Sequence, residues 1–341
     1  MTAEPATRAP EEAAVQGVRV NADDAVRVHA DDVARDGRPP SPPVGPSLDT
    51  ERFARFYERS GVRIAKSASA WWYEAAPRFL LALPSHRPLT LPADEAADLM
   101  RRERLAGLRY ICNEGDGGRA SFHLVCDDPE FGLDKLSANT RSKVRRGLTR
   151  NEIRRVTGRE LAEIGEGAFV ETMVRQNRAS ESAMQTWRRM LAAADDEPAI
   201  EIWTAWHEGE FACYLIAVRI DDVCEFFQAR SVGRLLKHYP NNALIYTLTE
   251  EMLVKRGLRE VTFGIESPEP VEDLDAFKVQ MGYRKKPVRQ RVIFHPLLRT
   301  ALSIGPLRRA LLAKGSDPTA DVRLRKAAGI LKFADGEDAS S

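Results

Sequence analysis

Residues 241–267 read NNALIYTLTEEMLVKRGLREVTFGIES, and residues 276–286 read AFKVQMGYRKK. Asn241 and Asn242 are of the residue type that caps helix N-termini, and Gly257 is of the type that ends helices. The alternating residues 260–265 then predict a strand. The stretch therefore predicts a helix that begins at the edge of a sheet, where its free N–H groups and dipole favour a phosphate or carboxylate. Simple capping by the two asparagines is the structural alternative.

The residues around this stretch predict a mixed α/β fold. Three apolar runs, 199–207, 211–219 and 223–230, are separated by short turns and predict an antiparallel meander. The middle run is apolar on both faces, which predicts a covered, central strand. Helices are expected over 165–177, 180–195 and 273–281, and a last strand over 289–294.

The N-terminal part of the chain divides into two regions. Residues 1–47 contain no Phe, Trp or Tyr and end in RPPSPPVGPS, so we expect a disordered tail and a stiff linker. Residues 48–134 predict a mixed α/β region with helices over 48–61 and 91–107, and with a strand pair over 108–113 and 121–126. We assign no chemistry to this region.

Composition sets broad limits. The 341 residues fit one large domain or two ordinary ones, and the near balance of 51 basic and 50 acidic residues indicates no particular partner. Cys112, Cys126, Cys213 and Cys224 lie far apart and are expected to be buried, reduced thiols of a cytoplasmic protein. We find no apolar run near the ~18 residues of a spanning helix, and no secretory signal at the N-terminus.

Two segments are strongly basic. A helix expected over 135–159 has nine Lys or Arg and one acid, Glu152. It either attracts a phosphate-rich donor such as tRNA or CoA, or forms a solvated face. Basic amphipathic helices and a tail are expected over 297–341. Their first part, 297–314, either docks on the protein or makes weak contact with a membrane surface.

An ordered set of motifs extends over residues 136–296. It comprises S-x-x-T-R-x-K-V-R-R from Ser137, Y-P-N-N-A-L from Tyr239, R-G-L-R-E-V-T-F-G from Arg256 and F-K-x-x-M-G-Y-R from Phe277. Together with the meander, this set resembles the FemAB-like branch of the GNAT N-acyltransferase superfamily. The resemblance implies an α/β fold with a mixed sheet, built from two tandem GNAT-like lobes: a degenerate lobe over 48–134 and an acyltransferase lobe over 135–296. It also requires a splayed strand pair beside the helix at Asn242.

The resemblance further implies a transferase that moves an acyl or aminoacyl group onto an amine. GNAT enzymes seat the CoA pyrophosphate on a loop of the form [QR]-x-x-G-x-[GA]. This chain has Arg230 and Gly233 in that pattern but Leu235 in its final position. That departure puts standard acetyl-CoA binding in doubt, and leaves longer acyl-CoA, aminoacyl-tRNA or an inactive site open.

Candidate catalytic residues are few. Glu225, between apolar residues on a predicted strand, is a candidate general base if burial raises its pKa, and Glu266 is a second candidate. Gln228 lies on the same strand, in a position that we expect to face the opposite way. Tyr283 resembles the aromatic residue that ends the GNAT pattern, where it would shape the acyl channel or protonate the leaving thiolate. Solvent exposure of the acids and core packing of the tyrosine are the structural alternatives.

The candidate binding residues lie around the predicted helix N-terminus. If Phe277 faces the core, Lys278 points elsewhere and can hold a phosphate as a point charge. In the family that the chain resembles, this Phe-Lys pair is associated with the substrate cleft. Gln228, Arg230, Asn241 and Asn242 complete the set of binding residues, and a solvated helix lysine is the structural alternative for Lys278.

We find no GxSxG, HExxH, Walker or GxGxxG motif, and His123, His207 and His238 are isolated from one another. We therefore expect no metal and no permanently bound cofactor. The favoured function is acyl transfer from acyl-CoA, as co-substrate, to a small-molecule or peptide amine without a covalent enzyme intermediate. An aminoacyl-tRNA-dependent transferase and a non-catalytic binding protein on the same fold are the alternatives.

Overall fold

The computed structural model describes residues 48–338, apart from 177, 269–271, 316 and 318–319. The tail predicted over 1–47 lies outside the described residues. The part of the chain from residue 48 onward belongs to one compact unit.

The first half of this unit mixes short strands and helices. Its elements are α1 (Thr50–Arg59), β1 (Ile64–Lys66), β2 (Trp71–Ala76), β3 (Phe79–Leu83), α2 (Ala93–Arg102), β4 (Gly107–Cys112), β5 (Arg119–Cys126), α3 (Ala138–Arg150) and β6 (Asn151–Val156). The second half begins with three helices and the predicted meander. Its elements are α4 (Gly158–Ile164), α5 (Glu166–Arg175), α6 (Glu181–Ala194), β7 (Ile200–His207), β8 (Glu210–Ile220), β9 (Val223–Ser231), a 3₁₀ segment η4 (Gly233–His238), α7 (Pro240–Glu250), a π-helical turn η5 (Glu251–Lys255), β10 (Glu260–Ile265), α8 (Glu272–Gln280), β11 (Arg284–Phe294), α9 (Pro296–Leu302), α10 (Gly305–Gly315) and α11 (Val322–Asp338).

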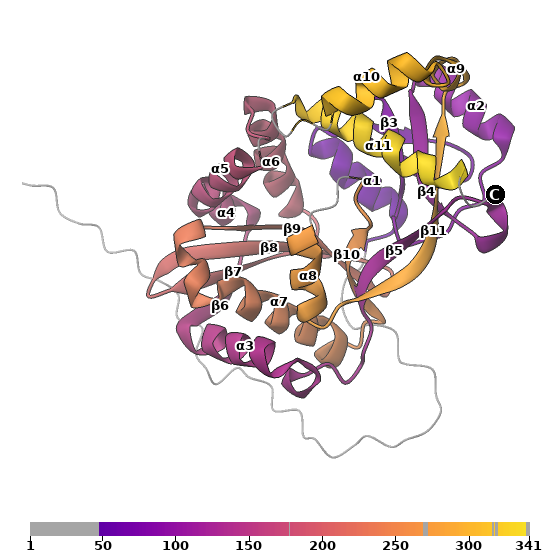
Figure 1. The fold of residues 1–341 in the computed structure, drawn as a ribbon. Helices are drawn as coiled ribbons and strands as arrows, with labels where there is room; N and C mark the ends of the chain where they lie inside the picture. The colour runs from indigo at the N-terminus through magenta and orange to yellow at the C-terminus, as the bar shows by residue number, and fades with distance from the viewer. Residues whose placement is uncertain (1–47, 177, 269–271, 316, 318–319, 339–341) are drawn as a thin grey trace, which may run out of the picture. The chain divides into compact units, whose positions relative to one another are not determined.

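All the named strands belong to one mixed sheet of eleven strands, in the order β1-β2-β3-β4-β11-β5-β10-β9-β8-β7-β6. The late strand β11 lies between β4 and β5 and pairs antiparallel with both. In turn, β5 pairs with β10. Strands from the two predicted lobes therefore alternate in the middle of the sheet, where Figure 1 shows the long orange β11 beside the magenta β5.

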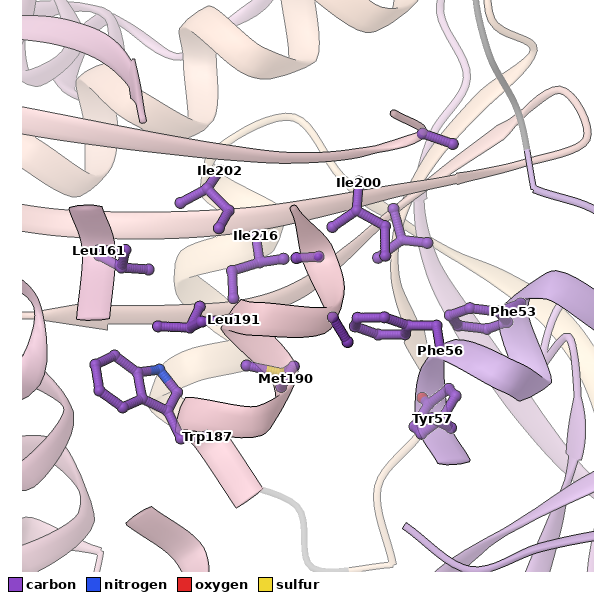
Figure 2. Close-up of a cluster of buried hydrophobic side chains, with 14 of the residues drawn as sticks. Phe53, Phe56, Tyr57, Leu161, Trp187, Met190, Leu191, Ile200, Ile202 and Ile216 are labelled. Atoms are coloured by element: carbon purple, nitrogen blue, oxygen red, sulfur yellow. The ribbon is translucent and has the colours of Figure 1, made fainter. Parts of the chain in front are cut away.

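The sheet carries a separate core on each face of its C-terminal half. On one face, Trp187 and Leu191 of α6 pack against β7 and β8, next to Phe53 and Phe56 of α1 (Figure 2). On the other face, α3 and α7 cover the same strands, with Leu244 and Leu248 among the buried residues. Every residue of β8 after Glu210 is buried, which confirms the predicted central strand.

The basic helix predicted over 135–159 is shorter than expected. The helix α3 ends at Arg150, and β6 then pairs with β7 as the edge of the sheet. Asn151 explains the change of direction, because its side-chain amide donates to the carbonyl oxygens of Gly147 (2.8 Å) and His238 (2.9 Å). These bonds satisfy a carbonyl at the helix C-terminus and hold the chain for the turn into a strand.

The C-terminal segment forms α9, α10 and α11. Phe333 and Ile330 of α11 pack against Phe79 and Val292 of the sheet, so α11 is docked. Leu297 and Ile304 are instead 77% and 55% exposed. Within the described residues, none of the helices combines the length and apolar character needed to cross a membrane.

Candidate active site

Two neighbouring strands separate in the middle of the sheet. The parallel strands β9 and β10 pair over only three positions, and the last pair joins Glu225 to Thr262. Beyond it, β10 bends toward β5 through an irregularity that includes Gly264, whose φ of +83° is readily adopted by glycine. The splayed pair required beside the α7 helix is therefore present, and Glu225 lies at the point where the strands part.

A β-bulge determines which side chains of β9 share a face. Glu225 pairs with Val218, and Gln228 pairs with Ile216. Both partners belong to the core that α1 and α6 cover, and directly paired side chains lie on the same face of a sheet. The expectation that Glu225 and Gln228 face opposite ways was wrong, because the extra residue Phe227 shifts the alternation by one position.

Burial controls the acidity of Glu225. Neighbouring protein atoms desolvate its carboxyl and raise its pKa to about 7, although part of the side chain reaches solvent. Two tyrosines lie close to it: Tyr57 of α1 and Tyr73 of β2 stack at 4.5 Å and hydrogen-bond to each other. Burial, with a smaller contribution from Glu225, raises the pKa of Tyr73 to about 12. The site thus combines a carboxyl that titrates near neutrality with phenols that stay protonated.

A buried polar chain continues from this point toward β4 and β11. The Arg109 guanidinium donates to the Gln290 side chain at 2.7 Å and to the carbonyl oxygen of Glu266. The Gln290 amide donates to Ser121 at 2.6 Å, and the Ser121 hydroxyl donates to the Glu266 carboxylate at 2.7 Å. The Glu266 carboxylate is therefore engaged in this network.

Gln228 and Arg230 line a cavity of about 280 Å³ between β9 and the helices α5 and α6. The Tyr214 hydroxyl donates to the Gln228 carbonyl at 2.7 Å and accepts from the Trp187 indole at 3.0 Å, so Gln228 is held in place. Burial lowers the pKa of Arg230, and the Nε atom of Arg230 has no hydrogen-bond partner in the described part of the chain.

The other predicted residues lie on the opposite face of the sheet. Tyr283 is buried, and its hydroxyl is 2.7 Å from that of Thr249. Lys278 forms an ion pair with Asp275 at 3.1 Å and lies 5.2 Å above the ring of Phe263, which follows Thr262 on β10. The structure therefore brings Lys278 to the splayed strands from the side opposite Glu225. Phe277 packs against the core of that second face.

The start of α7 differs from the predicted asparagine cap. Tyr239, with a φ of +60°, precedes the helix, and Pro240 takes its first position. Asn241 accepts a hydrogen bond from Ser231 at 2.8 Å, and the Asn242 amide contacts the sulfur of Met281 at 3.3 Å. The asparagines thus tie the first turn of α7 to its neighbours.

The loop before α7 is occupied by a side chain of the protein. The Gly233 N–H donates to the Glu171 carboxylate of α5 at 2.9 Å. The Glu171 carboxylate therefore accepts the hydrogen bond that the Gly233 N–H could otherwise donate to a phosphate oxygen.

Several residues of this site were missed in the sequence. Tyr57, Tyr73, Arg109 and Ser121 come from the region to which we assigned no chemistry, and Gln290 comes from the last strand. An arginine inside the apolar run LRYIC was the one available signal, because a charged residue in a central strand needs a reason.

Comparisons with known proteins agree with this geometry. Residues 134–278 match the family model described as an acetyltransferase (GNAT) domain. The solved structure of FemX is similar at 13% identity with a TM-score of 0.54, over 77% of this chain and 96% of FemX. A conserved protein of unknown function from Bacteroides thetaiotaomicron is similar at 8% identity with a TM-score of 0.51, over 72% of this chain and 90% of that one.

The C-terminal domain of a putative lysylphosphatidylglycerol synthetase from Agrobacterium fabrum aligns at 12% identity with a TM-score of 0.49, over 75% and 92% of the two chains. A sequence comparison with curated proteins gave no match. Residues 134–278 are thus similar to the GNAT acetyltransferase domain, and the chain is an acyltransferase with a GNAT-like fold.

Proposed function

We propose that the protein is an N-acyltransferase that moves an acyl group from an activated donor directly to an amine, with Glu225 as general base. The observation that supports it is the position of Glu225 where β9 and β10 part, with burial raising the pKa of its carboxyl to about 7. A base works best when its pKa lies near the working pH. Glu225 then removes a proton from the acceptor ammonium, and the free amine attacks the acyl carbonyl.

The two faces of the sheet divide the substrates. The acceptor amine approaches Glu225 from the α1–α6 side, where Gln228 and Arg230 line a cavity. The donor approaches from the α7–α8 side, where Lys278 lies beside the splayed strands. Tyr283, Asn241, Asn242 and Phe277 then shape the donor side, and Glu266 supports the polar chain through Ser121. Direct transfer requires orientation more than covalent catalysis, which fits a site without a nucleophile triad.

Acyl-CoA is the first donor to test. The purified protein is incubated with short and long acyl-CoAs and a panel of amines, and release of the CoA thiol is measured between pH 5.5 and 9. We expect a rate that rises with pH and levels off above about 7, because Glu225 must be deprotonated. The Glu225→Gln variant should lose about 10²-fold or more in rate. Undiminished turnover by this variant would remove Glu225 from the mechanism.

A charged tRNA is the second donor, and one observation favours it. Glu171 holds the Gly233 amide, so the loop before α7 presents a carboxylate to an incoming pyrophosphate. At the same time, α3 exposes Arg145, Arg146 and Arg150, and Arg146 lies 4.8 Å over the Tyr239 ring at the start of α7.

This second donor predicts salt-dependent binding of charged tRNA that the double substitution of Arg145 and Arg146 by Gln weakens. Arg101→Gln, on the exposed face of α2, is the matched control. Equal weakening by both variants, or tight binding of acyl-CoA without tRNA binding, would decide against the tRNA donor.

Three expectations remain predictions. They are the division into lobes 48–134 and 135–296, a cytoplasmic location, and the membrane-surface contact of 297–314. For the last, Leu297 and Ile304 are exposed beside Arg299 and Arg309. Sedimentation with anionic vesicles tests it directly.

A further inference from the structure

A groove of about 630 Å³ lies between α2, the end of β11 and α9. Figure 1 shows α9 at the end of β11, beside α2. Met100 of α2 and Phe294 of β11 are among its apolar residues, and two arginines, Arg291 and Arg299, line it as well. The volume falls within the roughly 300–1,000 Å³ of ligand pockets, so the groove can hold part of an amphipathic molecule.

The two arginines of the groove can bind an anion. Both are exposed, and Arg291 donates to the carbonyl oxygen of Asp116 at 3.1 Å. Among the residues that the structure describes, neither Arg291 nor Arg299 forms an ion pair. Guanidinium groups bind phosphate oxygens through paired N–H donors. The groove therefore combines two positive charges with an apolar floor, which matches a molecule that carries a phosphate and a hydrocarbon chain.

Exposed apolar side chains lie next to this groove. Thr300 lines the groove, and Leu297 precedes it by about one helical turn, so the two share a side of α9. Leu297 is 77% exposed, and Ile304, just after α9, is 55% exposed. Arg309 and Lys314 of α10 add exposed positive charge. Large apolar side chains beside cations are typical of segments that lie on an anionic membrane surface.

A bilayer fits this surface better than a protein partner does. Protein interfaces are depleted of charged residues at their centre. Arg299 lies between Leu297 and Ile304 in the sequence, so a protein that covered both apolar residues would also cover this charge. At a bilayer, the guanidinium reaches the phosphate layer while the apolar side chains enter the hydrocarbon boundary.

We propose that the groove between α2, β11 and α9 binds one anionic phospholipid, and that Leu297 and Ile304 hold the protein on the bilayer that contains it. The headgroup phosphate lies between Arg291 and Arg299, and an acyl chain contacts the apolar floor of the groove. This lipid site lies outside the proposed acyl-transfer site and does not depend on which donor or acceptor the enzyme uses. It gives the predicted surface contact of the C-terminal segment a defined ligand.

Sedimentation of the full-length protein with vesicles tests the surface contact. One set of vesicles contains phosphatidylcholine alone, and the other also contains about 30 mol% phosphatidylserine, which supplies negative charge. We expect binding to the anionic vesicles, and binding to the neutral vesicles that is about tenfold weaker or less.

Variants assign this binding to the residues beside the groove. Leu297→Ser combined with Ile304→Ser should weaken binding about tenfold, and Arg299→Gln should weaken it about fivefold. Val170→Ser combined with Val174→Ser is the matched control for the apolar pair, because these side chains of α5 are 40% and 61% exposed. Arg159→Gln, at an exposed position of α4, is the control for the arginine.

The groove itself is tested by filling it. Ala97 of α2 is exposed and lines the groove, so the side chain of an Ala97→Trp variant occupies it without entering the core. Mass spectrometry of the intact protein, after the vesicles are removed, measures the lipid that stays bound. The natural protein should keep one phosphatidylserine molecule, and the Ala97→Trp variant should keep none. Ala138→Trp, at the exposed start of α3, is the matched control and should keep the lipid.

Equal binding to both kinds of vesicle, equal weakening by the control variants, or lipid retention that Ala97→Trp leaves unchanged would each overturn the lipid site. Saturable binding of inorganic phosphate in calorimetry, without any binding to vesicles, would overturn it as well and would indicate a free anion as the ligand. Glu225→Gln should bind vesicles as the natural protein does, so failure of the proposed base and failure of the lipid site are distinguishable. Retained circular dichroism and melting temperature confirm that each variant is folded.

Discussion

Replacing Glu225 by Gln should stabilise the protein at alkaline pH. Burial raises the pKa of the Glu225 carboxyl from 4.5 to about 7, and each pKa unit corresponds to about 1.4 kcal/mol. The folded state therefore binds a proton that the unfolded chain has already released between these two values. Stability contributed by the neutral carboxyl is present at low pH and is lost as the pH rises through about 7.

The size of this gain in stability follows from the shift in the pKa of Glu225. At pH 8 the buried carboxylate destabilises the folded state of the natural protein by about 3 kcal/mol, and a neutral glutamine of the same shape avoids that cost. At pH 5 the difference should fall below about 1 kcal/mol, because the native carboxyl is then protonated. The assay is urea unfolding followed by tryptophan fluorescence at both pH values, with Glu163→Gln on the exposed side of α4 as the control.

Two results would contradict this prediction for Glu225. A gain in stability that is the same at pH 5 and pH 8 would show that packing or hydrogen bonding causes it. No gain at pH 8 would show that the carboxylate is solvated in the folded protein. Either result would rule out Glu225 as a base that titrates near neutrality.

Two further predictions concern the neighbours of Glu225. Gly264→Ala should cost about 1 kcal/mol in urea unfolding because of its positive φ, and it should also lower activity, since the new methyl would lie 3.8 Å from the Glu225 carboxylate. The control is Gly257→Ala, which has a φ of +64° and no side chain or backbone within 4 Å, and which should lose stability but not activity. Equal losses of activity in the two variants would contradict the effect of the contact with Glu225. Tyr214→Phe should cost about 1–3 kcal/mol because it leaves the Trp187 indole and the Gln228 carbonyl without their shared partner. Urea unfolding measures this loss of stability. A loss smaller than that caused by the same substitution at an exposed tyrosine would refute the prediction.

The sequence predicted the C-terminal half of the fold because its periodicities are strong. The run 211–218 is apolar at nearly every position, and only a strand covered on both faces buries such a run. Glu225 became a candidate for a related reason, since it lies between Cys224 and Phe226, whose side chains are buried. At these positions the burial that the sequence pattern predicts agrees with the burial in the structure.

The rest of the site depends on features that periodicity does not encode. A bulge at Phe227 moves Gln228 to the face of Glu225, and one inserted residue leaves no mark in an apolar run. Arg109 and Gln290 meet only because β11 pairs with β4, a contact between residues far apart in the chain. The residues that the early strands bring to the site were therefore missed, while Glu225, Gln228 and Arg230, which lie on one strand, were already candidates.

The insertion of β11 between β4 and β5 has a consequence for synthesis of the chain. As the ribosome extends the polypeptide, β4 and β5 emerge early, yet one edge of each must wait for Arg284–Phe294, although β4 pairs with the earlier strand β3 on its other edge. Until then both strands expose unpaired N–H and C=O groups, which are templates for pairing with other chains. Such long-range pairing also slows folding. The nascent chain thus has an extended vulnerable interval, in which chaperone binding or slow production should improve yield.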